Sequence, residues 1–172
     1  MTAPNRWFSA RASSCVCRPL RPRGDVSATA PTIHASAVLV GSCGILIRGP
    51  SRSGKSSLAW SLLHSGGAGF SRLLGDDRIH LEAAHGRLLM RPAPALAGLI
   101  EVRGVGIVRL PYEPLAVVSL VVDLGVTDAQ RLPQKTELKT TIEGVVLTRL
   151  PVAPAVDQLA KISALLVADS AI

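Results

Sequence analysis

Short apolar runs separated by turn residues dominate the chain from residue 31 onward. Residues 35–40 and 45–48 are rich in Val, Leu and Ile, and the segment Gly41-Ser42-Cys43-Gly44 between them is typical of a hairpin turn. Residues 78–83 alternate between apolar and polar side chains, and His85-Gly86 then turns the chain into another apolar run at 87–91. The pattern therefore predicts two β-hairpins.

The remaining apolar segments predict further strands and two helices. We expect a short strand at 72–74, an apolar stretch at 99–108, a buried strand at 117–124 and a strand at 142–150. Residues 56–65 and 156–167 have helical spacing, and the polar segment 127–139 is predicted as a loop or short helix. Because hairpins outnumber helices, the sequence predicts an α/β fold with a mixed, hairpin-rich sheet rather than a repeating βαβ array.

Composition indicates one folded domain preceded by a basic tail. Of the 172 residues, 48% are hydrophobic but only 3% are aromatic, so the core must be built from aliphatic side chains. Residues 1–33 carry five arginines and one aspartate, more than half of the net charge of +7. We expect residues 1–30 to be a disordered tail and 31–172 the catalytic domain. A targeting signal or an interaction arm is the alternative for the tail.

Charge and hydropathy argue against two classes of partner. The sequence has no basic stripe interleaved with aromatic side chains, which argues against nucleic-acid binding. The longest apolar stretch, residues 115–122, contains Ser119 and is far shorter than the roughly 20 residues of a membrane-spanning helix. Cys15, Cys17 and Cys43 lack metal-ligand spacing and indicate reduced thiols, so we expect a cytoplasmic protein without a membrane segment.

The strongest chemical motif follows the first predicted hairpin. Residues 49–56 match the Walker A pattern G-x-x-x-x-G-K-[ST] between an apolar strand and a helix, as a phosphate-binding loop requires. Glycines let backbone N–H groups surround phosphate oxygens, Lys55 places a cation on the β- and γ-phosphates, and Ser56 offers a hydroxyl to Mg²⁺. The predicted nucleotide-binding residues are Gly49, Pro50, Ser51, Arg52, Ser53, Gly54, Lys55, Ser56 and Ser57.

Candidate acid–base groups and metal ligands lie outside this loop. Asp76 and Asp77 follow the strand at 72–74, where one carboxylate can reach Mg²⁺ while a bend turns the other elsewhere. A solvated Asp-Asp turn is the alternative. If the first hairpin centres on Ser42-Cys43, His34 lies opposite Ser51 and beside the phosphates, where its imidazole can assist proton transfer. A surface histidine at a strand end is the alternative.

Three segments together resemble the catalytic domain of HPr kinase/phosphorylase. They are Ile33-His34-Ala35, the loop at 49–56 followed by Asp76-Asp77-Arg78, and residues 99–107, which contain Glu101-Val102-Arg103-Gly104-Val105-Gly106. A Glu-x-Arg-Gly-x-Gly run downstream of a Walker A loop resembles the signature of this family. The resemblance covers residues 31–150, and the chain looks like the short form of some α-proteobacteria, which lacks the family's N-terminal domain.

The resemblance implies an enzyme that uses ATP, or pyrophosphate, with Mg²⁺ to phosphorylate one serine of HPr, a phosphocarrier of the sugar phosphotransferase system. It also implies a reverse reaction with inorganic phosphate, a homo-oligomer, and a fold related to phosphoenolpyruvate carboxykinase. Longer family members have a basic Pro-Gly-Arg-Asn stretch where residues 151–156 of this chain carry no charge. The sequence therefore leaves the reverse reaction and a hexamer open.

The resemblance also implies roles for individual residues. Lys55 and Ser56 match the family's phosphate-binding lysine and metal-binding hydroxyl. Asp76 matches the catalytic acid–base, and Asp77 matches a carboxylate on the metal side. His34 matches the histidine near the attacked phosphate.

Three further residues take their roles from the resemblance alone. Glu101 matches an active-site carboxylate that supports the metal, Arg131 matches a downstream catalytic arginine, and Arg103 belongs to the signature without an assigned role. Without the resemblance, each is interpreted as a solvated side chain. Two other functions stay open: a small-metabolite kinase, which usually carries an arginine-rich helical lid, and a non-catalytic nucleotide sensor.

Overall fold

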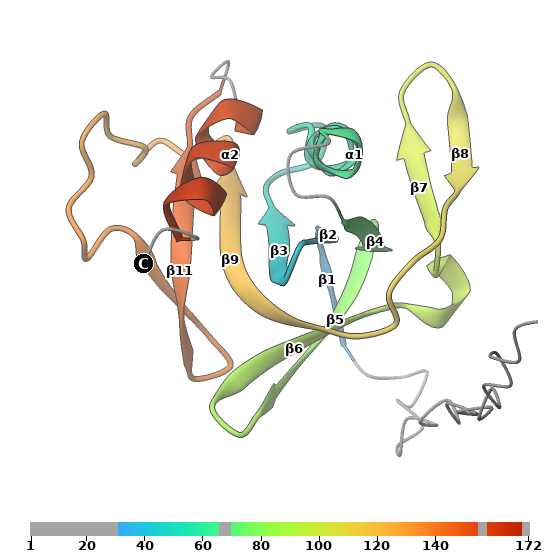
Figure 1. Cartoon of the computed structure of the whole chain (residues 1–172), viewed down its shortest axis with the longest axis horizontal. Coiled ribbons are helices and arrows are strands. Elements are labelled where there is room, and N and C mark those ends of the chain that lie inside the picture. The colour runs from blue at the N-terminus through green and yellow to red at the C-terminus, as the bar shows by residue number, and fades with distance from the viewer. Residues whose placement is uncertain (1–30, 66–69, 155–157, 170–172) are drawn as a thin grey trace, which may run out of the picture.

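The computed structural model of the chain describes residues 31–65, 70–154 and 158–169 (Figure 1). The expected tail at residues 1–30 lies outside them. The helices are α1 (Lys55–His64), α2 (Gln158–Asp169) and the short 3₁₀ helix η1 (Pro94–Leu96). The strands are β1 (Thr32–His34), β2 (Ser36–Val40), β3 (Cys43–Arg48), β4 (Ser71–Gly75), β5 (Arg78–Ala84), β6 (Arg87–Pro92), β7 (Leu99–Val102), β8 (Gly106–Arg109), β9 (Ala116–Leu124), β10 (Lys139–Ile142) and β11 (Val145–Val152).

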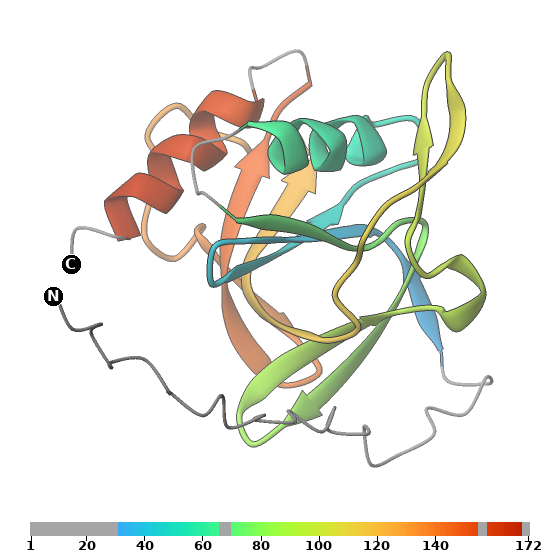
Figure 2. The ribbon, with the colours of Figure 1, turned by 45° about the vertical axis from the view of Figure 1, so that its right-hand side comes forward.

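Within the described residues, nine strands form one curled mixed sheet. Seven of them follow the order β1-β5-β6-β9-β3-β2-β4, and β11 adds to β9 and carries β10. Strand β9 is parallel to β3 and β11, and the other pairs are antiparallel. Because β9 pairs with β6 near its start and with β3 further along, it bends as it passes between the two parts of the sheet (Figures 1 and 2). Strands β7 and β8 form a separate hairpin.

Alternate residues of β3 divide the core into two clusters. Ile45 and Ile47 point toward α1 and α2, which lie over the same face of the sheet (Figure 2). Leu46 points to the opposite face, inside the curl of the sheet. This division follows from the two-residue period of a strand that is buried on both faces. Among the described residues, no helix is long and apolar enough to cross a membrane.

The two predicted hairpins are present, but the register of the first differs from the prediction. Strands β2 and β3 are joined by a two-residue turn at Gly41-Ser42, and Ser36 pairs with Ile47. Gly41 adopts φ 58°, which glycine allows without steric cost, so the tight turn replaces the predicted four-residue turn. The expectation that His34 pairs opposite Ser51 is therefore wrong, because His34 pairs with Arg78 of β5.

One further prediction is corrected near the end of the chain. The strand predicted at 142–150 is the second half of a hairpin, because Glu143 and Gly144 adopt φ 49° and 75° and turn the chain between β10 and β11. Residues 127–138 form a loop, which is one of the two alternatives predicted for 127–139, and Lys139 begins β10. The predicted helix at 156–167 is described from Gln158 onward.

Candidate active site

The predicted phosphate-binding loop connects β3 to α1 and curls around the side chain of Lys55. The ammonium group donates to the carbonyl oxygens of Gly49 at 3.1 Å and Pro50 at 3.0 Å. A Cβ atom at Gly49 would lie 2.7 Å from Ser53 Oγ and 2.9 Å from Leu124 O, so this position requires glycine. Gly54 adopts φ 91° at the N-cap of α1, which aims the amino end of the helix into the loop.

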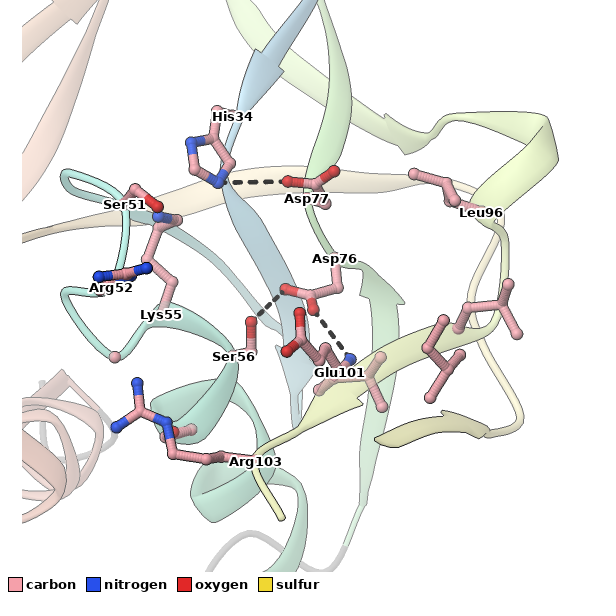
Figure 3. A pocket seen from close by; sticks show the side chains of 15 residues that line it. His34, Ser51, Arg52, Lys55, Ser56, Asp76, Asp77, Leu96, Glu101 and Arg103 are labelled. Atoms are coloured by element: carbon pink, nitrogen blue, oxygen red, sulfur yellow. Dashed lines mark hydrogen bonds and ion pairs between the residues drawn. The ribbon is translucent and has the colours of Figure 1, made fainter. Parts of the chain in front are cut away.

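A pocket of about 460 Å³ opens beside this loop. Residues from several distant parts of the chain line it, including the predicted His34, Asp76, Asp77, Glu101 and Arg103. Figure 3 shows Ser56, Asp76 and Glu101 facing one another in this space, with the Lys55 side chain running along the loop toward Ser51. The structure thus brings together most of the residues selected from the sequence.

Asp76 is 7% exposed and is held by donors from three elements. Its Oδ1 atom accepts hydrogen bonds from Ser36 Oγ at 2.5 Å and from Ser56 Oγ at 3.0 Å. Its Oδ2 atom accepts a hydrogen bond from the backbone N–H of Glu101 at 3.2 Å. These contacts hold the carboxylate in one orientation at the base of the pocket, directly beside the predicted metal-binding hydroxyl.

Asp77 turns away from Asp76 toward the mouth of the pocket. It adopts φ 69°, and its Oδ1 atom lies 3.2 Å from His34 Nε2, with side chains 62% and 52% exposed, respectively. The backbone N–H of Arg78 donates to Asp76 O at 2.9 Å and closes the bend. Adjacent carboxylates therefore point in different directions, and the one that contacts Ser56 is Asp76.

Glu101 and Arg103 reach the pocket from β7 and the turn that follows it. Both line the pocket, and Figure 3 shows the Glu101 carboxylate on the side of Asp76 and Ser56. Arg131 is exposed in the loop between β9 and β10 and is not among the residues that line the pocket. Its catalytic role stays a prediction.

The sequence analysis missed Ser36, the third side-chain member of the contacts around Asp76. Ser36 is 0% exposed in β2, two residues after His34. A buried hydroxyl requires a hydrogen-bond partner, so a serine inside an apolar strand near a candidate site is a signal available in the sequence. Its partner was not predictable, because Ser36 and Asp76 lie 40 positions apart.

A second missed group is the ion-pair cluster at the carboxyl ends of β3 and β9. Asp123 binds Arg48 through two contacts of 2.8 Å and Arg149 through one of 2.7 Å, and Arg149 also contacts Asp128 at 2.7 Å. Burial raises the pKa of Asp123, but hydrogen bonds from the two arginines outweigh burial and hold that pKa below its ordinary value. The hydrogen bonds that Arg149 donates to Asp128 and Asp123 raise the pKa of its guanidinium group. Because both arginines bind its carboxylate, Asp123 has a structural role and is not a free metal ligand.

Hard oxygen ligands suited to Mg²⁺ gather on the opposite side of the loop. Ser56, Asp76, Asp77 and Glu101 all line the pocket and supply a hydroxyl and carboxylates there, although no cluster of three or more His, Cys, Asp or Glu residues forms a metal site within the described residues. Mg²⁺ in nucleotide sites usually takes only one or two carboxylates, and phosphates and water complete its coordination. The donor set at this site fits that pattern.

Comparison with known proteins identifies one family. The profile of the HPr serine kinase C-terminal domain matches residues 26–167. The HPr kinase/phosphorylase of Limosilactobacillus reuteri is 32% identical over 133 residues, which cover 70% of this chain and 40% of that protein. The HPr kinase/phosphorylase of Clostridium tetani is 37% identical over 79 residues, or 46% of this chain and 25% of that protein. The chain thus matches only a minor part of the length of these relatives.

A solved structure shares the fold. The HPr(Ser) kinase/phosphatase from Coxiella burnetii superimposes with a TM-score of 0.66 over 81% of this chain and 96% of that chain, at 23% sequence identity. The α/β fold with its curled mixed sheet is therefore also the fold of that structure. Because the family profile also spans most of the sequence, this chain belongs to the HPr serine kinase C-terminal domain family.

Proposed function

We propose that this chain transfers a phosphoryl group from ATP, or from pyrophosphate, to a serine of the phosphocarrier protein HPr. The observation that carries the proposal is the Asp76 carboxylate, held by Ser36, Ser56 and the Glu101 amide beside the phosphate-binding loop. Binding a nucleotide requires only the loop, whereas a fixed carboxylate next to it is what an acceptor hydroxyl requires. The family relationship supports the same reaction.

The loop and Lys55 are suited to holding the phosphoryl donor. The ammonium group of Lys55 donates hydrogen bonds to two carbonyl oxygens of its own loop, which phosphate oxygens can replace. The positive end of α1 adds a favourable field for an anion. Ser56, Asp77 and Glu101 are the proposed Mg²⁺-side groups, and the bound ion would neutralise charge on the transferred phosphate.

Asp76 is the proposed proton acceptor. The serine oxygen of HPr forms a bond to the terminal phosphorus as the bond from that phosphorus to the leaving oxygen breaks, and the serine proton passes to Asp76. In the reverse direction an oxygen of inorganic phosphate forms a bond to the phosphoserine phosphorus as the bond from that phosphorus to the serine oxygen breaks. Asp76 returns the proton to the serine oxygen, and pyrophosphate is the product. His34 lies beside Asp77 and influences the charge at the mouth of the pocket. Arg131 would have to approach from the loop after β9.

The finer details of fold and assembly are also proposals. Strand β3 lies between a parallel neighbour, β9, and an antiparallel neighbour, β2. A parallel-sheet NTPase places parallel strands on both sides, so this arrangement supports the relationship to phosphoenolpyruvate carboxykinase. We also propose that the chain forms a homo-oligomer, as its resemblance to the family implies.

A transfer assay tests the function. Purified protein with labelled ATP and Mg²⁺ should phosphorylate HPr, and Asp76→Asn should lower kcat by about 10²- to 10⁴-fold while nucleotide affinity is retained. Asp77→Asn should lower kcat less, and the opposite order would assign the base to Asp77. Adding phosphate to phosphorylated HPr tests the reverse reaction.

Two other results would overturn the proposal. Tight ATP binding without transfer to HPr would indicate a nucleotide sensor. Transfer to a small metabolite in place of HPr would indicate a metabolite kinase.

A further inference from the structure

The hairpin of β7 and β8 has two different faces. Ile100 is 1% exposed and packs with Val102 into the core cluster that includes α1. The register places Glu101 opposite Ile107, so these two side chains share the other face, and both line the pocket. One face of the hairpin therefore belongs to the core, and the other belongs to the pocket.

Aliphatic side chains on the pocket side of this hairpin are largely exposed. Ile107 is 74% exposed, and Val105, at the tip, is also 74% exposed. Leu96 and Leu99 continue the apolar surface along the wall of the pocket. We call Leu96, Leu99, Val105 and Ile107 the apolar strip. Side chains exposed to this degree contribute little to folding, and a group of them beside a site is typical of an interaction surface.

The apolar strip is accessible to a large molecule. Figures 1 and 2 both show the β7–β8 hairpin projecting beyond the body of the domain. Leu99 and Ile107, two of the members that line the pocket, lie on the same strand pair as Glu101, whose backbone amide contacts Asp76. A chain segment that follows the hairpin is thereby led toward the proposed catalytic carboxylate.

Positive charge flanks the apolar strip. Arg109 pairs with Leu99 in the hairpin register, and Arg103 lines the pocket near the tip. Both are exposed, and neither takes part in a salt bridge within the described part of the chain. Arg52 adds a third exposed cation to the lining of the same pocket. These charges are complementary to an acidic partner.

We propose that the apolar strip docks the acceptor protein through a segment that has an aliphatic residue near the accepting serine and a carboxylate near Arg103 or Arg109. The inference rests on the proposed phosphoryl transfer and adds to it the surface that recognises the acceptor. A small metabolite would fill only the pocket and would not contact the exposed Val105 at the hairpin tip. A protein segment is the occupant long enough to cover the strip.

Binding of HPr in the presence of Mg²⁺ and a non-hydrolysable ATP analogue tests this surface. By isothermal titration calorimetry, Val105→Ser and Ile107→Ser should each weaken HPr binding about 10-fold, the usual size of a single important contact. Arg109→Glu should weaken binding further and reduce its salt dependence. Val105→Ser should leave the affinity for the nucleotide analogue unchanged.

Matched controls lie on β10 and β11, among residues that do not line the pocket. Val146→Ser removes a valine that is 63% exposed, and Lys139→Glu reverses an exposed charge; both variants should bind HPr like the wild type. Equal affinity of Val105→Ser, Ile107→Ser and wild type would overturn the docking surface even if phosphate transfer occurs. HPr binding that depends on the strip, without transfer, would instead refute the proposed function alone. Failure of wild type to bind HPr would overturn both.

Discussion

Asp76 shows how a single carboxylate is positioned by residues that are distant in the sequence. Its donors come from β2, from the first turn of α1 and from the backbone of β7. Oδ1 receives two hydroxyl groups and Oδ2 one amide, so the carboxylate has little rotational freedom. Fixing a catalytic group before the substrate arrives avoids an entropic cost during the reaction. At the scale of the residue, holding the Asp76 carboxylate is the one role that the structure indicates for Ser36.

Ser36 is therefore predicted to act as a positioning residue. Ser36→Ala removes a fully buried donor and should lower kcat for HPr phosphorylation about 10-fold, with the KM for ATP nearly unchanged because the loop is intact. Ser36→Thr keeps the hydroxyl and should recover most of the activity. Steady-state kinetics of the three proteins measures both effects.

Ser71→Ala serves as the control for loss of a hydroxyl. Ser71 Oγ donates to Leu63 O at 2.8 Å, away from the pocket, so this variant should keep full activity. If Ser36→Ala raised only the KM for ATP, or if Ser36→Thr were as slow as Ser36→Ala, the positioning role would be refuted.

At the scale of elements, ion pairs connect three neighbouring strands. Arg48 of β3, Asp123 of β9 and Arg149 of β11 form a continuous set of contacts directly before the phosphate-binding loop. Arg149 extends this set to Asp128 in the loop that carries Arg131. The cluster thus connects the start of the phosphate-binding loop with the segment that holds a candidate catalytic arginine.

Asp123→Asn is predicted to destabilise the fold, because it leaves two partly buried arginines without their shared carboxylate. The free energy of unfolding at pH 7 should fall by about 2 to 3 kcal/mol. Since the folded-state pKa of Asp123 lies below its ordinary value of 3.8, the carboxylate stabilises the fold above pH 3.8, and the effect is lost as the pH falls through the folded-state pKa. The difference between variant and wild type should therefore shrink below pH 3.8.

Urea unfolding over a pH series measures this difference. Glu82→Gln, which breaks the exposed contact with Arg91, is the control and should cost at most about 0.5 kcal/mol. A difference between wild type and Asp123→Asn that stays constant down to pH 2 would contradict an electrostatic origin.

At the scale of the whole molecule, the loop proposed to bind phosphates connects the sheet to a helix that covers one of its faces. It begins at β3, in the middle of the sheet, and ends in α1, which packs on the helix-covered face. The β7–β8 hairpin packs against α1 and completes the pocket. A ligand in this pocket would contact several separate parts of the fold, so its binding should stabilise the domain against unfolding.

ATP with Mg²⁺ at about 100 times its Kd is predicted to add about 2.7 kcal/mol to the free energy of unfolding. For a domain of this size, the thermal midpoint should rise by roughly 5 to 10 °C. Lys55→Ala should lose most of this increment, since the ammonium group is the central cation of the loop. Differential scanning calorimetry measures the increment for each protein against its own nucleotide-free state. An equal increment in Lys55→Ala would refute the assignment of the loop.

Local features of the sequence were sufficient to predict a loop at 49–56 between a strand and a helix, the helices α1 and α2, and the hairpins β2–β3 and β5–β6. Gly54 before Lys55, the apolar spacing of α1 and the His85-Gly86 turn act over a few neighbouring residues, and such effects can be read from a single segment. The same reasoning failed for the first hairpin, where the turn lies closer to β2 than predicted, and for His34, which lies in the separate strand β1 and pairs with β5. Register depends on the geometry of the turn, which the residue pattern does not determine uniquely.

By itself, the sequence determined which chemical groups are available: a loop for phosphates, an adjacent pair of aspartates, and the Glu-x-Arg-Gly-x-Gly run. Only the tertiary structure decided which of them meet. It paired β1 with β5, brought the Glu101 amide to Asp76, buried Ser36 against the same carboxylate, and surrounded Asp123 with arginines. These contacts join positions 25 to 75 residues apart, and their geometry follows from sheet topology and from the cost of burying a polar group without a hydrogen-bond partner.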